Sequence, residues 1–269
     1  GDAVGDVGSS FAAVVFDGVF TRDDRCERPL VRLDVFVDHE PPGIVVELDY
    51  DQRGGAVIDL GLRSPTTHCG WSGAARSRVL VADAVATPGY LPTSMAAGSW
   101  QVLLGLHRIP EPGIPYRLTV RAATQAEVAA ERSAVPIAPD VPERGPRRHL
   151  PSPNGLTWVA ADLHSHTVHS DGALTVPQLA ALAVERRLDV LAVTDHNTIS
   201  HHRELPAAAA RYGITLVPGQ EITTDFGHAN AWGDIGFVDF TAPADLWPQI
   251  VAQRGGLLSI NHPVAADCS

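Results

Sequence analysis

The chain has 269 residues, of which 45% are hydrophobic and 19% are charged, and its formal net charge is −11. This length allows two domains, and the apolar fraction is ordinary for a globular protein. The acidic balance disfavours a surface for phosphate backbones, which needs clustered Lys and Arg, so no nucleic-acid partner is expected.

Neither a transmembrane segment nor a secretory signal is visible in the sequence. No run of 18 apolar residues is present, so we expect no membrane association. The three cysteines, Cys26, Cys69 and Cys268, are scattered without metal-type spacing. A sparse, odd number of cysteines fits a reducing compartment, and we therefore expect a cytoplasmic protein.

Residues 1–133 are expected to form an all-β domain. Apolar and polar residues alternate over Val31–Val37, Trp100–Leu106 and Tyr116–Val120, as they do in half-buried strands. Turns rich in Gly and Pro separate these segments. Short strands at such spacing predict a β-sandwich or jelly roll, whose core or interface would contain Trp71 and Tyr90.

A linker is expected over residues 134–155. This stretch is too rich in proline for a helix or a central strand; its prolines are Pro136, Pro139, Pro142, Pro146, Pro151 and Pro153.

Strand and helix patterns alternate over residues 156–269. The apolar runs of the buried-strand type are Trp158–Ala161, Asp189–Val193, Ile214–Pro218 and Leu257–Ile260. The intervening segments predicted to be helical are Leu179–Arg187, 201–212 and 243–254, and the first follows a capping box of Thr175 and Gln178. This alternation predicts a β/α barrel with its functional groups at the C-terminal ends of the strands.

Potential metal ligands follow each of these apolar runs. His164 and His166 come after the first run, and residues two apart at a strand end point to the same side. His196 follows the second run, Glu221 the third and His262 the fourth. Imidazoles and a carboxylate that converge on one point are typical of a metal site.

The order and spacing of these motifs resemble the PHP (polymerase and histidinol phosphatase) domain over about residues 157–269. The matching segments are Asp162–His166, Ser170–Gly172, Thr194–Asn197, Pro218–Glu221, Gly227–His228 and Asn261–Pro263. The resemblance implies a distorted (β/α)7 TIM-like barrel with a centre of two or three divalent metal ions.

The resemblance also implies a role for each ligand. His164 and His166 would bind the first metal, and Glu221 would bridge the first and second. His228 and His262 would complete the second metal's shell. Asp171 and His196 would hold the third metal, and with Glu221 they are the residues expected to be catalytic. Ligands without cysteine suit Zn, Mn or Fe.

One motif of the family has no counterpart, namely the Asp-x-His that follows its last strands. The sequence stops at Ser269, seven residues after His262, and it starts with Gly rather than Met. We therefore expect a fragment whose barrel lacks its C-terminal part. Were the chain complete, the alternative would be a non-catalytic, metal-stabilised binding module.

The N-terminal half has a second resemblance, carried by the segments 70–73 and 86–92. They are similar to segments of the β domain in carbaryl-hydrolase-like PHP metallohydrolases. This likeness leaves two ester classes open. The first expectation is a phosphoesterase acting on a small-molecule ester through a metal-activated hydroxide. The alternative is a carbamate or carboxylic ester hydrolase. A polymerase-associated nuclease is disfavoured by the acidic charge.

Neighbours of the expected ligands have two readings each. Asp195 either fixes the tautomer of a ligand or is structural, and Asp162 and Asn261 have the same alternatives. Solvated loop positions are expected for three further histidines, with substrate or phosphate contacts as the alternative; these are His169, His201 and His202. Arg203 is expected to be a surface charge, with binding of an anionic substrate as the alternative.

Overall fold

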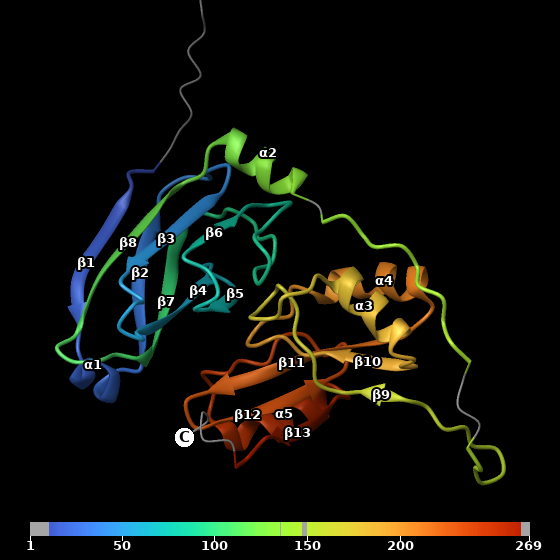
Figure 1. The fold of residues 1–269 in the computed structure, drawn as a ribbon. Coiled ribbons are helices and arrows are strands. Elements are labelled where there is room, and N and C mark those ends of the chain that lie inside the picture. Colours follow the sequence, from blue (N-terminus) through green and yellow to red (C-terminus); the bar gives the residue numbers. More distant parts are fainter. Residues whose placement is uncertain (1–10, 135, 147–149, 265–269) are drawn as a thin grey trace, which may run out of the picture. The chain divides into compact units, whose positions relative to one another are not determined.

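The computed structural model describes residues 11–134, 136–146 and 150–264, which form two compact units (Figure 1). One unit comprises the described residues up to Cys69 and those from Gly73 to Ala134. The other comprises Gly70–Ser72 and the described residues from Pro136 onward. Each unit has its own hydrophobic core.

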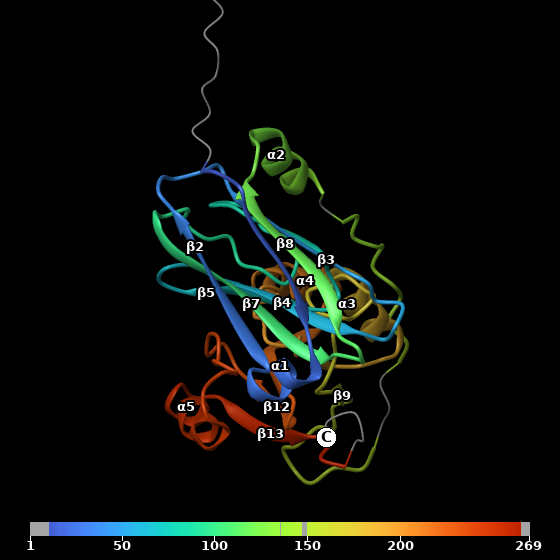
Figure 2. The same cartoon turned by 90° about the vertical axis from the view of Figure 1, so that its left-hand side faces the viewer.

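The first unit consists of two four-stranded sheets, in the orders β1-β8-β3-β6 and β2-β7-β4-β5 (Figures 1 and 2). Their strands are β1 (Val14–Phe20), β2 (Leu30–Val37), β3 (Ile44–Tyr50), β4 (Val57–Arg63), β5 (His68–Gly73), β6 (Arg78–Val81), β7 (Gly98–Arg108) and β8 (Ile114–Ala122). One core cluster contains Val46 and Leu118 from the first sheet together with Leu60 and Leu104 from the second. Both sheets therefore bury one face in a shared core, which is how two packed antiparallel sheets exclude water.

The three strands predicted for this part lie within β2, β7 and β8. Tyr90 is fully buried, and its hydroxyl donates to the carbonyl of Leu60 at 2.9 Å; Trp71 is buried as well. Two short helices, α1 (Arg22–Glu27) and α2 (Gln125–Ser133), each start with a capping box.

Between α2 and the next strand, the described residues contain no helix or strand, as the prolines predict. The described residues of this segment from Pro136 onward belong to the second unit and contact the other residues of that unit. Arg144 pairs with Asp189 at 3.2 Å and donates to the carbonyl of Gly213, while the hydroxyl of Tyr212 donates to the carbonyl of Pro139 at 2.8 Å. The bounds predicted for the β domain (1–133), the linker (134–155) and the barrel domain (156–269) remain predictions.

The second unit is built on a five-stranded mixed sheet in the order β13-β12-β11-β10-β9 (Figure 1). Its strands are β9 (Ala161–Asp162), β10 (Val190–Val193), β11 (Thr215–Thr224), β12 (Gly227–Trp232) and β13 (Leu257–Asn261). The first three in the chain are parallel, whereas β12 is antiparallel to both β11 and β13. The closed (β/α)7 barrel stays a prediction, because the described sheet is open.

One prediction about these strands was wrong. The four predicted strands run in the same direction, and β12 lies antiparallel between β11 and β13, because only two residues separate the paired Thr224 and Gly227 and a parallel crossover needs a dozen or more. The strand predicted from Trp158 starts only at Ala161. Trp158 and Val159 are exposed by 59% and 56%, so these apolar side chains do not line a buried strand.

The predicted helices are present with shifted bounds. They are α3 (Val176–Glu185), α4 (Leu205–Tyr212) and α5 (Trp247–Gln253), and the 3₁₀ turns η1 (His202–Glu204) and η2 (Ala244–Leu246) precede the last two. Pro177, Pro206 and Pro248 lie in the first turns, where the missing N–H breaks no helical hydrogen bond. Apolar residues of α3 and α4 form one core with Leu191 and Val193 of β10. Within the described residues, no helix is long and apolar enough to cross a membrane.

The reversal of β12 determines which residues meet at one edge of the sheet. β9, β10, β11 and β13 end at this edge, and β12 starts there, since Gly227 pairs with Thr224 and His228 pairs with Asn261. All predicted ligand positions lie at or near this edge.

Candidate metal centre

Glu221 of β11 lies at the centre of the histidine cluster, and its side chain is completely buried. Its Oε2 lies 3.1 Å from Nε2 of His164, 3.3 Å from Nε2 of His166 and 3.2 Å from Nδ1 of His196. The two histidines after β9 also face each other, with their Nε2 atoms 3.1 Å apart. Three imidazoles from the ends of β9 and β10 thus converge on one oxygen.

The second oxygen of Glu221 faces the antiparallel strands. Oε1 lies 3.2 Å from Nδ1 of His228 and 3.2 Å from Nε2 of His262. The side-chain amide of Asn261 donates to the same oxygen at 2.7 Å and to Oδ1 of Asn230 at 2.9 Å. Each carboxylate oxygen therefore has its own set of imidazole neighbours.

Asp171 lies on the opposite side of His166 and His196. Its Oδ1 is 3.8 Å from Nδ1 of His166, and its Oδ2 is 3.7 Å from Nε2 of His196. The following residue has to be glycine, because a Cβ at Gly172 would lie 2.4 Å from the carbonyl oxygen of His166. The side chain of Asp171 is 65% exposed, so this corner of the cluster is open to solvent.

The structure brings all seven predicted ligands together. Six form three overlapping groups with ligand atoms within 4.8 Å of one another; these are His164–His166–Glu221, His166–Asp171–His196 and His196–Glu221–His228. His262 joins the cluster through Glu221. The division of these residues among two or three ions stays a prediction.

The surroundings of Glu221 keep it ionised. Burial alone would raise its pKa, but the adjacent imidazoles of His164, His228 and His196 and the amide of Asn261 outweigh burial, so the pKa lies well below its ordinary value. A buried anion facing several imidazoles is a favourable environment for a cation.

The pKa values of two of the imidazoles, His196 and His164, shift in opposite directions. Burial lowers the pKa of His196 to about 4, although the charge of Glu221 opposes this shift. The contact with Glu221 raises the pKa of His164, and burial only partly offsets it. His196 is therefore neutral at pH 7, as a metal-ligating imidazole has to be.

The donor set fits divalent metal ions. Among the described residues, no hydrogen-bond donor is aligned with the buried Oε2 of Glu221, although three ring nitrogens lie within 3.3 Å of it. Such an oxygen normally has a partner, and a cation held between it and the ring nitrogens would supply one. Imidazole and carboxylate ligands suit Zn, Mn and Fe alike.

Asp195 supports the loop that carries the ligands. Its carboxylate is fully buried and accepts from the Thr167 amide at 2.7 Å, from the Thr167 hydroxyl at 2.7 Å and from the Ser170 hydroxyl at 2.6 Å. The fourth partner, His201, lies 3.0 Å away. No described contact joins Asp195 to a predicted ligand ring, so the structural reading is the one that the contacts favour.

The prediction of solvated loop positions was wrong for His169 and His201, which are buried, and His202 is only partly exposed. His169 contacts Glu204 at 2.9 Å, and His201 and His202 donate to the carbonyls of Val193 and Gly219. Inside the fold these partners replace the hydrogen bonds that the rings would otherwise make with water. Burial and the neighbouring His201 lower the pKa of His202 to about 4. Arg203 is exposed, as expected for a surface charge.

Asn261, for which the sequence left a ligand-fixing and a structural role open, contacts Glu221 directly. Asp162 accepts from the backbone amide of His164 at 3.1 Å and so fixes the start of the ligand loop. Sequence reasoning missed Asn230 and Thr223, which support Asn261 and His196. The two-residue spacing could have identified them. Thr223 is two residues after Glu221 and Asn230 is two residues after His228, so each shares a strand face with a predicted ligand.

Comparison with known proteins agrees with these motifs. Residues 162–249 match the model of the PHP domain. An uncharacterized protein of Methanocaldococcus jannaschii is 30% identical over 124 residues, which cover 40% of this chain and 70% of that protein.

Two characterised relatives match a shorter segment. The 5'-3' exoribonuclease Rnm of Escherichia coli is 46% identical over 68 residues, and the 3',5'-nucleoside bisphosphate phosphatase of Chromobacterium violaceum is 42% identical over 66 residues. Each match covers 24% of this chain and 23% of the relative. The chain thus spans about a quarter of the length of these relatives.

Proposed function

The chain belongs to the PHP domain family, and on this basis we propose that its second unit is a metal-dependent hydrolase acting on phosphoesters. The observation that carries the proposal is the buried carboxylate of Glu221 with five imidazoles within 3.3 Å of its oxygens. The names of two relatives, an exoribonuclease and a nucleoside bisphosphate phosphatase, both describe phosphoester chemistry and support the ester class.

Divalent ions held by this cluster would acidify a water molecule and neutralise charge that develops on phosphoryl oxygens. The ligands proposed to hold them are His164, His166, Asp171, His196, Glu221, His228 and His262. Glu221 lies between the two sets of imidazoles and is proposed to bridge two ions.

Asp171 and His196 are proposed to act at the open side of the centre. The Oδ2 of Asp171 and the Nε2 of His196 lie 3.7 Å apart, and Asp171 is largely solvent-exposed. A carboxylate in this position can accept a proton from water at the cluster or bind a further cation. Asn261 holds Glu221 in place from the opposite side through a charge-assisted hydrogen bond.

A small phosphoester is the proposed substrate, because the net charge of −11 disfavours a long polyanion. A carbamate or carboxylic ester remains the second candidate from the N-terminal resemblance. The third is a metal-stabilised module without turnover.

The test begins with elemental analysis of protein purified without added metal. The same sample is assayed with p-nitrophenyl phosphate, adenosine 3',5'-bisphosphate and 1-naphthyl methylcarbamate. We expect two or more metal equivalents with turnover of a phosphate substrate. Turnover of the carbamate alone would select the second ester class, and stoichiometric metal without turnover would select the binding module.

Two substitutions make the test specific. Glu221→Gln keeps the shape of the side chain but removes the central charge, so we expect loss of metal and activity together. Glu204→Gln is the matched control, because Glu204 contacts His169 and lies outside the ligand groups. Absence of metal from the wild type, with every ligand intact, would refute the proposal.

A further inference from the structure

The two ring nitrogens of His196 have different neighbours in the cluster. Nδ1 lies 3.2 Å from Oε2 of Glu221 and 2.5 Å from the hydroxyl oxygen of Thr223. Nε2 lies 3.7 Å from Oδ2 of Asp171, at the open corner of the cluster. A neutral imidazole carries one proton, so only one of its nitrogens has a lone pair for a metal ion. The contacts of the ring decide which nitrogen that is.

The hydroxyl of Thr223 is an acceptor for Nδ1 of His196. Its own proton is directed to the carbonyl oxygen of Glu221 at 3.3 Å, and a hydroxyl has only one proton to donate. The oxygen is therefore left to accept from Nδ1–H of His196. Oε2 of Glu221 does not share this proton, because no donor in the described part of the chain is aligned with it. These contacts favour the proton on Nδ1 and the lone pair on Nε2.

The lone pair of Nε2 faces a corner where the fold leaves polar atoms unsatisfied. The distance of 3.7 Å to Asp171 is too long for a hydrogen bond, but it is close to the roughly 3.4 Å between two ligands of a tetrahedral ion with bonds of about 2.1 Å. The buried Nδ1 of His166 lies 3.8 Å from the same carboxylate and has no hydrogen-bond partner within the described ranges. The rings of His166 and His196 are stacked with their centroids 4.4 Å apart, which fixes the plane of the His196 ring.

Asn197 holds the backbone of Thr223 in place. Its Oδ1 accepts from the Thr223 amide and its Nδ2 donates to the Thr223 carbonyl, both at 2.9 Å. Asn197 is buried and has a φ of 50°, in the left-handed region that asparagine tolerates better than most residues. Backbone in this region is common at functional sites. The side chain extends the contact between the two strands beyond His196 and Glu221, which form a parallel bridge.

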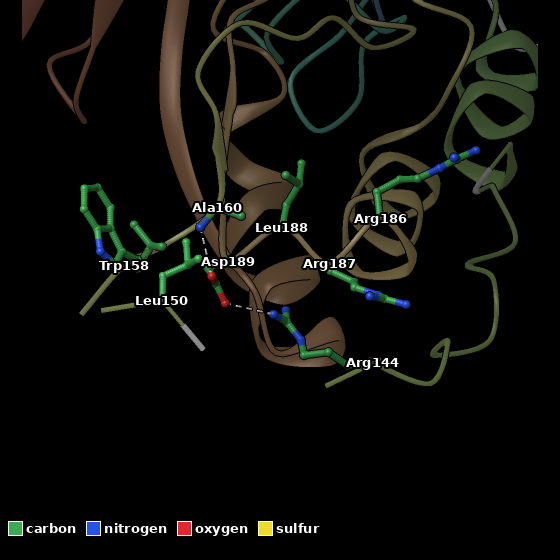
Figure 3. A pocket seen from close by; sticks show the side chains of 10 residues that line it. Arg144, Leu150, Trp158, Ala160, Arg186, Arg187, Leu188 and Asp189 are labelled. Atoms are coloured by element: carbon green, nitrogen blue, oxygen red, sulfur yellow. Dashed lines mark hydrogen bonds and ion pairs between the residues drawn. The ribbon is translucent and has the colours of Figure 1, made fainter. Parts of the chain in front are cut away.

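The strand that leads to His196 is anchored at its other end as well. The carboxylate of Asp189, directly before β10, pairs with Arg144 at 3.2 Å and accepts from the amide of Ala160 at 3.0 Å (Figure 3). Because β10 is fixed at both ends, it can hold one imidazole in a single orientation.

We propose that Thr223, held by Asn197, is a positioning residue that keeps the proton of His196 on Nδ1 and presents Nε2 to a metal ion beside Asp171. This inference rests on the proposed metal centre and adds the atom through which His196 binds. Metal-ligating histidines usually donate their second ring nitrogen to a carboxylate, a backbone carbonyl or water. Here the hydroxyl of Thr223 is that acceptor, and Oε2 of Glu221 is left to the ion held by His164 and His166.

The first test determines the tautomer of His196 in the metal-stripped full chain at pH 8. Long-range ¹H–¹⁵N correlation spectra of protein labelled with ¹⁵N-histidine distinguish protonated from unprotonated ring nitrogens, and the signals missing in His196→Gln assign the ring. We expect a protonated Nδ1 and an unprotonated Nε2 in the wild type. Thr223→Ser keeps the hydroxyl and should give the same pattern. Thr223→Val has the same shape without the acceptor, so the proton should move toward Nε2, where Asp171 and water can accept it.

The second test measures metal affinity of the same variants by chelator competition. Thr223→Val should weaken one metal equivalent about 10–100-fold, as is typical when a ligand loses such a partner, and Thr223→Ser should restore it. Thr215→Val removes a hydroxyl at the exposed start of β11 and is the matched control, which should leave the tautomer and the metal affinity unchanged. Thermal unfolding of each variant verifies that it is folded.

The two tests separate this inference from the proposed function. Wild-type protein that binds no metal would refute the proposed function. A wild type that binds metal but carries the His196 proton on Nε2 would overturn this inference and leave the proposed function standing. The same conclusion would follow if a folded Thr223→Val protein matched the wild type in both tautomer and metal affinity.

Discussion

The substitution Asp195→Ala tests whether the loop of metal ligands depends on one buried carboxylate. Asp195 is fully buried and accepts three hydrogen bonds of 2.6–2.7 Å from Thr167 and Ser170. Its second oxygen also faces Nδ1 of His201 at 3.0 Å. Alanine would leave the Thr167 amide and the hydroxyls of Thr167 and Ser170 without their partner, and these groups belong to the segment between His166 and Asp171.

The expected magnitude follows from these contacts. Each buried donor left without its partner costs about 1–3 kcal/mol, and the lower part of that range for the three donors of Thr167 and Ser170 gives about 3–5 kcal/mol. For a unit of this size, that loss corresponds to a decrease of roughly 10–20 °C in the unfolding midpoint. The isosteric variant Asp195→Asn should lose only about 1–2 kcal/mol, because its oxygen can still accept from the Thr167 amide and the Ser170 hydroxyl. Its NH₂ group can donate to Nδ1 of His201, whose Nε2 carries the proton donated to Val193.

The assay is urea unfolding of the wild type and both variants, with metal content measured on the same samples. Asp195→Ala should lose both stability and metal, whereas Asp195→Asn should retain most of its metal. Because the pKa of Asp195 in the folded protein is held below 3.8, its contribution to stability is present above that pH and is lost as the pH falls further. The difference in the free energy of unfolding between the wild type and Asp195→Asn should therefore become smaller below pH 3.8. An Asp195→Ala protein within 1 kcal/mol of the wild type, roughly the error of such a measurement, would refute the reasoning.

Three further changes test other parts of the second unit. Gly172→Ala places a Cβ 2.4 Å from the carbonyl oxygen of His166 and should lower metal affinity in a competition titration. Unchanged affinity would show that the loop accommodates the Cβ without displacing the ligands. The pKa of His202 is about 4 in the folded protein and about 6.5 in the unfolded chain. Below pH 6.5 a proton therefore binds His202 in the unfolded chain but not in the folded protein, and the free energy of unfolding should fall between pH 6.5 and 4. His202→Gln should flatten that decline in urea unfolding at pH 7 and pH 5, and an unaltered slope would contradict the assignment. Thr175→Ala removes the capping box of α3 and should cost about 1 kcal/mol, which Thr175→Ser should restore.

Local patterns predicted the candidate site well. His164 and His166 follow β9, and His262 follows β13, because an apolar run identifies a strand and the next polar residues lie at its end. The capping box and Pro177 predicted the start of α3 for the same local reason, whereas Pro206 and Pro248, which left the bounds of two helices open in the sequence, lie in the first turns of α4 and α5. Such features depend on a few adjacent residues, which the sequence shows directly.

Burial of polar side chains was harder to predict. His169 and His201 look like loop residues because they stand among Ser, Thr and Asn in the sequence. Their burial depends on Glu204 and Asp195, partners that only the folded chain brings within 3.0 Å. Conversely, Trp158 and Val159 look like a buried strand but are more than half exposed. Composition alone does not contain these long-range pairings.

The direction of β12 explains why the two oxygens of Glu221 have different neighbours. His164, His166 and His196 reach Oε2 from the ends of β9 and β10, which run parallel to β11. His228 stands near the start of its strand, so in a parallel arrangement it would lie at the far edge, roughly 15–20 Å away over five residues. The tight turn at residues 225–226 reverses the strand and places His228 opposite Thr223, within reach of Oε1. The antiparallel strands therefore build one half of the centre and the parallel strands build the other, with Glu221 shared between them.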